Sequence, residues 1–169
     1  MKESDLLRTS HELIQNGEIE KGLNLLQTNL QTNTDWIAAR YQYAVFLAQY
    51  NNDFKEASTQ LEKILEIQPK NLPANFFLGE LSEAQGSFLS AKNYYEKVEA
   101  INPNFPNLHH KLGMLLNRRY KNKSEVAAAY LEKAFENNPG DIDALYQFCL
   151  LYTSPSPRDA TLSRMPSSA

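Results

Sequence analysis

Prolines recur along the middle of the chain at a nearly constant spacing. Pro69 and Pro103 lie 34 residues apart, and Pro139 follows 36 residues after Pro103. Small and aromatic residues, such as Gly86 and Phe88, recur at matching places between them. A fixed period of about 34 residues is typical of helical hairpins stacked in series, because one hairpin cannot bury its apolar face alone. The spacing therefore indicates a repeat protein rather than a single globular core.

Helical periodicity fills the segments between these prolines. Leu61, Ile64 and Leu65 follow the i, i+3, i+4 rule, and no long alternating stretch suggests a strand. We expect nine helices, at residues 5–16, 19–31, 36–50, 54–67, 73–84, 88–101, 106–119, 124–137 and 142–148.

Turn residues stand at the expected helix ends. Gly17 and Gly86 can adopt the left-handed conformation that ends a helix, and the spaced prolines close the second helix of each hairpin. Pro73 and Pro106 are expected in first turns, where a missing N–H does no harm. Short polar side chains are expected to cap the helices that follow them: Asp53, Asn71, Ser87, Asn104 and Asp141.

Set against this period, the residues resemble the tetratricopeptide repeat. The third unit carries the fullest pattern, with Leu78, Gly79, Gly86, Phe88, Ala91, Tyr95 and Pro103. The second and fourth units repeat parts of it, and the first is degenerate. The resemblance implies an all-α fold: a right-handed α-solenoid of stacked antiparallel helix hairpins, with about four repeats and a truncated fifth.

The same resemblance divides the chain into a repeat domain and a tail. The domain spans residues 1–148, with units at roughly 3–35, 36–71, 72–105, 106–141 and a partial unit at 142–148. Composition changes abruptly at residues 149–169, which resemble translated sequencing-adapter read-through. A natural Ser/Pro-rich disordered tail is the alternative. On the adapter interpretation the intact protein is longer, and we expect self-association through the truncated C-terminal end.

Stacked hairpins of this family curve, with their first helices lining the inner surface. The resemblance implies a groove with an aromatic middle and a basic end, formed by Gln42, Tyr43, Phe46, Phe76, Phe77, Glu80, His110, Lys111, Met114 and Arg118. Such a groove would grip an extended or helical segment through apolar anchors. The alternative for each aromatic residue is simple packing between hairpins.

Composition and charge argue against several other kinds of partner and site. A net charge of −3 disfavours a nucleic-acid partner, and the single cysteine, Cys149, excludes an intrachain disulfide. The sequence shows neither a signal core nor a long apolar run, so we expect a cytoplasmic protein with no membrane partner. His109 and His110 are adjacent, so on a helix they diverge by roughly 100° and do not converge on a metal.

The sequence thus predicts a scaffold for protein–protein interaction that holds a partner segment in its concave groove. We find no phosphate loop, nucleophile with a placed base, or HExxH motif, and therefore expect no catalysis and no cofactor. The alternative is that the chain is the N-terminal targeting arm of a larger enzyme, for example a transferase, whose catalytic domain is missing.

Overall fold

The computed structural model describes residues 2–119 and 124–153, and every regular element in these ranges is helical. The chain divides into two compact units, Met1–Asn102 and Pro103–Ala169. The prediction of an all-α helical-repeat fold is therefore confirmed.

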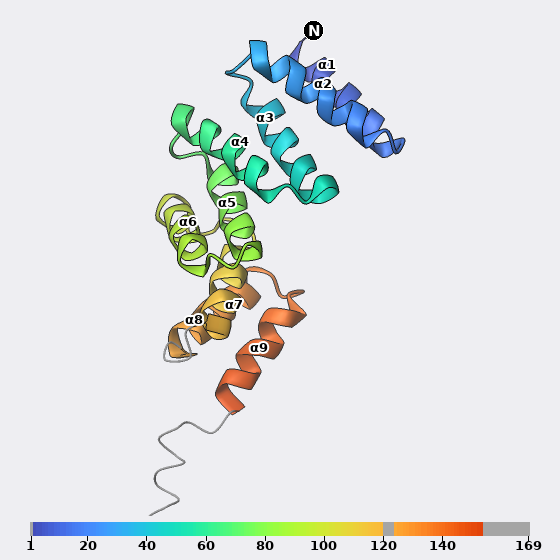
Figure 1. Ribbon diagram of the computed structural model, residues 1–169. Helices are drawn as coiled ribbons and strands as arrows, with labels where there is room; N and C mark the ends of the chain where they lie inside the picture. Colours follow the sequence, from blue (N-terminus) through green and yellow to red (C-terminus); the bar gives the residue numbers. More distant parts are fainter. Residues whose placement is uncertain (1, 120–123, 154–169) are drawn as a thin grey trace, which may run out of the picture. The chain divides into compact units, whose positions relative to one another are not determined.

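Unit 1 consists of three helix hairpins (Figure 1). Their helices are α1 (Glu3–Gln15) with α2 (Ile19–Thr32), α3 (Ile37–Phe46) with α4 (Phe54–Ile67), and α5 (Leu72–Ala84) with α6 (Phe88–Ile101). A π-helical turn, η1 (Leu47–Asn51), prolongs α3. The expected helices of this unit begin and end within two residues of the observed ones, since the glycines and prolines that punctuate the sequence also end the helices.

Small residues let the two helices of a hairpin pack closely. Ala57 of α4 and Ala91 of α6 are fully buried, as their positions in the repeat predicted. Gly79 of α5 lies against Tyr95 of α6, and a Cβ atom at this position would fall inside the van der Waals distance of the Tyr95 ring. Leucines fill the space around these contacts, and each fully buried one contributes roughly 1.5–3 kcal/mol to stability.

Unit 2 holds α7 (Leu108–Arg119), α8 (Ser124–Asn137) and α9 (Ile142–Thr153). Helices α7 and α8 form a hairpin of the same kind, with Gly113 of α7 facing Leu131 of α8. Helix α9 packs against both of them. It continues five residues past the expected end at residue 148, so the change in composition at Cys149 does not interrupt the helix. The remaining tail, residues 154–169, lies outside the described part.

Three of the expected caps are confirmed. Asp53 accepts a hydrogen bond from Glu56 N, Asn71 from Ala74 N, and Asp141 from Ala144 N, each at 3.0 Å.

The cap predicted at Ser87 is wrong, because its side chain makes no cap hydrogen bond although it occupies the N-cap position of α6. Asp53 has nearly the same backbone angles and does bond. The backbone angles therefore do not account for the missing bond at Ser87.

The predicted start of the seventh helix is also wrong. Pro106 and Asn107 form a turn instead, in which Leu108 N donates to Phe105 O at 3.2 Å and Asn107 has a φ of 61°. Proline followed by a residue with positive φ is the arrangement of a type II turn. Helix α7 consequently begins at Leu108, so Pro106 is not in its first turn and Asn104 is not its cap.

A buried polar residue occupies the same place in the first helix of three hairpins. Arg40, Asn75 and His109 each follow a fully buried apolar residue of that helix. Arg40 donates to Gln60 Oε1 at 2.6 Å and to Thr34 O at 2.9 Å. Asn75 donates to Pro69 O and Asn71 O, and His109 Nδ1 lies 3.0 Å from Asn137 Nδ2. The first helix of each of these hairpins is thus held by a different polar group: a guanidinium, an amide or an imidazole.

Candidate binding groove

A largely apolar groove of about 970 Å³ lies within unit 1, between α1, α3 and the start of α5. Its lining residues are Glu3, Leu7, Arg8, His11, Asp35, Ile37, Ala38, Tyr41, Gln42, Val45, Phe46, Asn71 and Pro73. A volume of this size falls in the range of sites that bury a ligand or a peptide segment.

Helix α3 forms one wall of the groove through residues spaced by four. Ala38, Gln42 and Phe46 lie along one line of the helix, and Tyr41 and Val45 lie along the next. On the opposite wall, Leu7 and His11 of α1 have the same spacing. The groove therefore follows from packing two regular helices side by side.

Polar contacts fix the two walls to one another. Glu3 of α1 accepts a hydrogen bond from Ala39 N at 3.0 Å, which satisfies one of the free donors at the start of α3. Gln42 Nε2 lies 3.4 Å from Leu7 O and 3.5 Å from Ser10 Oγ. The groove is consequently formed before any partner arrives.

Aromatic side chains join the two walls of the groove. The Phe46 ring stacks on His11 at 6.1 Å and meets Tyr50 edge-on at 5.9 Å. Phe46 is only 6% exposed, so it supports the groove more than it offers surface to a partner.

Phe76 and Phe77 serve packing between helices. Phe77 of α5 contacts Tyr41 of α3 at 6.1 Å, and Phe76 lies 5.5 Å from Tyr95 of α6. Burial, and then the charge of Glu80, raise the pKa of the Tyr41 phenol above its ordinary value. The structure thus brings Phe77 and Glu80 next to the groove wall, while Phe76 belongs to the α5–α6 contact.

Tyr43 lies on a different face of α3 from Gln42 and is 5% exposed. It lines a second, more polar cavity of about 780 Å³, together with Arg40, Glu56 and Gln60. Burial raises the pKa of Tyr43 and lowers that of Arg40. The structure therefore does not support Tyr43 as a partner contact, because residues adjacent on a helix point in directions about 100° apart.

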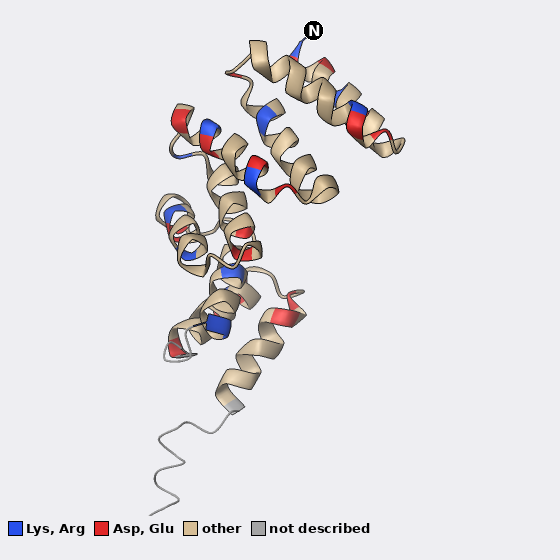
Figure 2. Ribbon diagram, in the orientation of Figure 1, with Lys and Arg blue, Asp and Glu red and all other residues tan. Residues whose placement is uncertain are grey.

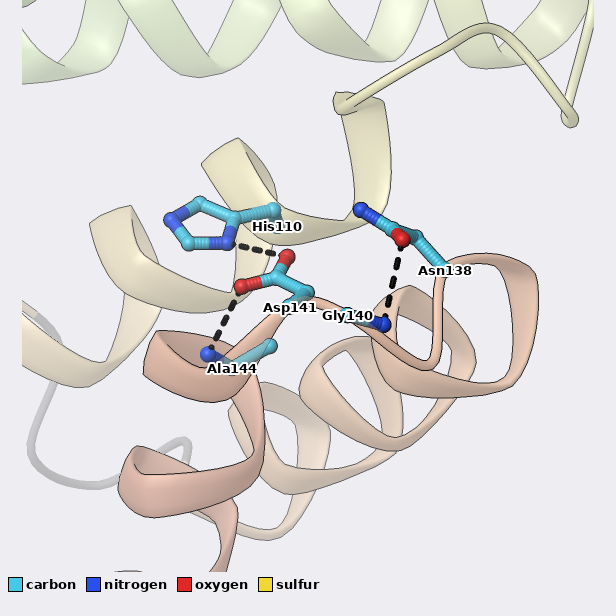
Figure 3. A network of polar contacts seen from close by, with 5 residues as sticks. All are labelled: His110, Asn138, Gly140, Asp141 and Ala144. Atoms are coloured by element: carbon cyan, nitrogen blue, oxygen red, sulfur yellow. Dashed lines mark hydrogen bonds and ion pairs between the residues drawn. The ribbon is translucent and has the colours of Figure 1, made fainter.

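In unit 2, helix α9 covers part of the predicted groove surface of α7. His110 Nδ1 lies 2.6 Å from Asp141 Oδ2, while Asp141 Oδ1 accepts from Ala144 N (Figure 3). Met114 packs against the cluster of Leu131, Ala134 and Ala144.

The two remaining predicted residues of unit 2 are more accessible. Lys111 is half-buried beside His110, and Arg118 is exposed at the end of α7. Part of the predicted basic end, at His110 and Met114, is therefore in contact with α9 rather than open to a partner.

Sequence reasoning missed several apolar residues of the groove lining. Leu7, Ala38, Tyr41 and Val45 all line it, and none was predicted. The spacing of four from Gln42 would have found Ala38. The α1 wall gave no signal, because the first repeat is degenerate.

Metal and membrane features can be assessed for the described residues. In the ranges 2–119 and 124–153, no three His, Cys, Asp or Glu side chains are grouped so that they could hold a metal ion. Within the same ranges, no helix is long and apolar enough to span a bilayer.

One part of the chain matches a known family in sequence. Residues 72–105 match the family model of the tetratricopeptide repeat, and they comprise α5, α6 and the turn residues that follow. Residues 72–105 are a tetratricopeptide repeat. The matched range coincides with the unit that carries the fullest pattern of Leu, Gly, Ala, Tyr and Pro.

Solved structures share the fold of this chain. MamA from Desulfovibrio magneticus RS-1 is similar with a TM-score of 0.78 and 19% identity, over 95% of this chain and 88% of that one. YrrB, described as a TPR protein with an unusual peptide-binding site, is similar with a TM-score of 0.68 and 22% identity, over 82% and 70% of the two chains. A comparison with curated protein sequences gives no match.

Proposed function

We propose that this tetratricopeptide repeat protein is a non-catalytic scaffold whose unit 1 groove binds an apolar segment of a partner protein. The observation that carries the proposal is the preformed groove of about 970 Å³ between α1, α3 and α5. The peptide-binding site described for YrrB, a protein of similar fold, supports the same class of function.

The lining of the groove suggests how a segment would bind. Leu7, Ala38, Tyr41 and Val45 supply apolar surface, and Gln42 supplies an amide that can pair with a peptide backbone. Arg8, Asp35 and the His11 imidazole border this surface. Apolar anchors that enter the groove provide affinity, while the polar rim selects among sequences.

Blocking the groove provides a direct test. Ala38 is exposed and lines the groove, so Ala38→Trp fills it without removing a core side chain. Peptides selected from a random phage-displayed library on the full chain should carry apolar anchors. They should bind the Ala38→Trp variant at least tenfold more weakly, which corresponds to about 1.4 kcal/mol.

A matched control separates groove blockage from general damage. Ala100 is an exposed alanine of α6, and it does not line the groove, so Ala100→Trp should leave peptide binding unchanged. Peptides that bind wild type and Ala38→Trp equally well would contradict the groove as the binding site. Failure to select any peptide on the wild-type chain would contradict the scaffold function itself.

A further inference from the structure

The second cavity of unit 1, of about 780 Å³, has a buried polar floor. Helices α2 and α4 supply its walls, and Arg40 and Tyr43 of α3 supply the floor, since each of them is 5% exposed. We call this space the Arg40 cavity. Lys63 and Glu66 of α4 are exposed at its rim. The Arg40 cavity shares only Asp35 with the lining of the unit 1 groove.

Arg40 is a buried cation without a carboxylate partner. It is the only charged residue of α3 (Figure 2), and it forms no ion pair with any described residue. Its guanidinium donates to two neutral oxygens, Gln60 Oε1 and Thr34 O, and its Nε–H finds no acceptor in the described part of the chain. Burial lowers the pKa of Arg40, and the charge of Glu66 opposes this shift only in part. Buried charges are normally paired, because an ion loses its hydration at a high cost.

Tyr43 adds a second buried donor without a partner. Its hydroxyl makes no hydrogen bond with a described residue, although the side chain is buried and lines the cavity. Burial, and then the charges of Glu56 and Asp53, raise the pKa of this phenol, so the hydroxyl keeps its proton near neutral pH. The great majority of buried polar groups in proteins are hydrogen-bonded. Two donors at one floor therefore lack an acceptor.

We propose that the Arg40 cavity binds a single carboxylate group, which accepts hydrogen bonds from the Arg40 guanidinium and the Tyr43 hydroxyl. The two donors are three residues apart in α3, so their side chains are neighbours on one side of the helix. A carboxylate offers two acceptor oxygens, and its hydrogen bonds to a guanidinium are among the strong ones in proteins. Lys63, one turn after Gln60 in α4, adds a positive charge at the rim.

The acids around the cavity favour a ligand with one negative charge. Asp35 and Glu66 are exposed at the rim, and neither forms an ion pair with a described residue. They repel a dianion such as phosphate more strongly than a monocarboxylate, and solvent weakens their effect on the buried floor. The third acid of the lining, Glu56, accepts a hydrogen bond from Gln60 at 2.6 Å and does not pair with Arg40.

NMR titration of the isotope-labelled full chain tests the proposal. The probe is a capped glutamate residue, acetylated at its nitrogen and amidated at its main-chain carboxyl group. It should shift the Nε–H resonance of Arg40 until the site is saturated, because this N–H gains an acceptor. Capped glutamine has nearly the same shape without the charge, and it should leave the resonance in place.

Acetate distinguishes two sources of the carboxylate. Acetate that binds as tightly as capped glutamate would identify a small organic acid as the ligand. Acetate that binds more weakly would identify an acidic side chain of a protein.

Tyr43→Phe is the informative variant, because it removes only a hydroxyl that bonds to no described residue. Its urea midpoint should match that of wild type. Capped glutamate should nevertheless bind about tenfold more weakly, which is the effect of losing a hydrogen bond to a charged acceptor. Tyr41→Phe is the matched control: Tyr41 lies two residues away in α3 and lines the unit 1 groove instead, so binding should be unchanged.

Three results would overturn the proposal. The first is an Arg40 Nε–H resonance that does not respond to capped glutamate, or that responds equally to capped glutamine. The second is unchanged affinity in Tyr43→Phe, since the floor hydroxyl would then take no part. The third is an equal loss of affinity in Tyr41→Phe, which would place the ligand outside the Arg40 cavity. None of these results bears on the unit 1 groove, because the peptide-binding test there uses other residues.

Discussion

Gly79 of α5 shows how one side chain can control a helix contact. The flexible backbone of glycine is not needed here, because the residue lies inside a helix; what matters is the missing Cβ, whose place is taken by the Tyr95 ring. The same relation holds between Gly113 and Leu131 in unit 2. At these positions the usual gain in helix propensity from alanine competes with a steric clash.

We therefore expect Gly79→Ala to destabilise unit 1 by about 1–3 kcal/mol, since an added methyl group must displace the buried ring. Urea unfolding followed by circular dichroism measures the effect. An exposed helical site supplies the control: Ser90→Ala in α6 should change stability by less than about 0.5 kcal/mol. A Gly79→Ala protein as stable as wild type would show that the hairpin can open at no cost.

Asp141 joins two interactions in one carboxylate. One oxygen caps α9 through Ala144 N, and the other pairs with His110 of α7. Asp141→Ala should weaken the docking of α9 by about 1–3 kcal/mol, the range for a lost cap and a charge-assisted hydrogen bond. Amide hydrogen exchange of α9 should accelerate accordingly.

The neighbouring aspartate is a matched control for this variant. Asp143 is exposed in the same first turn, so Asp143→Ala should alter the exchange of α9 much less. Equal acceleration by both substitutions would mean that Asp141 acts only as one more negative charge near the helix N-terminus.

At the scale of helices, the α5–α6 hairpin buries a phenol that resists ionisation. Burial, then the charges of Glu83 and Glu80 and the hydrogen bond to Glu83, raise the pKa of Tyr95 well above its ordinary value. Below pH of about 10 the phenol is neutral in the folded and unfolded chain alike. Above it the unfolded chain loses the proton while the folded chain retains it, so stability falls as the pH rises.

We expect Tyr95→Phe to reduce this alkaline loss of stability, at the cost of about 1 kcal/mol near neutral pH for the lost hydrogen bond. Urea midpoints measured from about pH 8 to about pH 11 span the relevant range. Tyr50→Phe, at an exposed position of η1, is the comparison variant. An unchanged alkaline slope in Tyr95→Phe would assign the effect to other tyrosines, such as Tyr41 and Tyr43.

The positions of the helices were largely predictable from the sequence. Which side chains line the groove was not. Gly, Pro and Asp act on the local backbone, so they located most helix ends. Pro106 gave a wrong helix start because proline suits both the first turn of a helix and a β-turn.

The groove lining was harder to predict, because the face of α3 that borders the groove depends on how α1 packs against it. Tyr43 and Gln42 are neighbours in sequence, yet only Gln42 lines the groove.

At the scale of the whole molecule, the apolar cluster that holds α9 is smaller than the cluster that runs through unit 1. One continuous cluster of buried apolar residues runs from Leu6 to Leu81 in unit 1. Helix α9 instead rests on a small cluster of Leu131, Ala134 and Ala144. Local opening requires little free energy where few apolar contacts are broken.

Hydrogen exchange of the intact protein at low concentration should therefore find α9 less protected than α5. The expected order follows from the sizes of the two clusters, and mass spectrometry of peptic peptides resolves it. Protection of α9 equal to that of α5 would show that the described contacts understate how firmly α9 is held.

The buried polar residue shared by three hairpins has a consequence for the repeats as building blocks. Arg40, Asn75 and His109 hold equivalent places, but each bonds to partners of its own: Gln60 and Thr34, the Pro69 carbonyl, and Asn137. Placing one of these side chains at the equivalent position of another hairpin, without its partners, would leave a buried polar group unpaired. The buried polar residue and its partners are therefore expected to change together whenever one hairpin is exchanged for another.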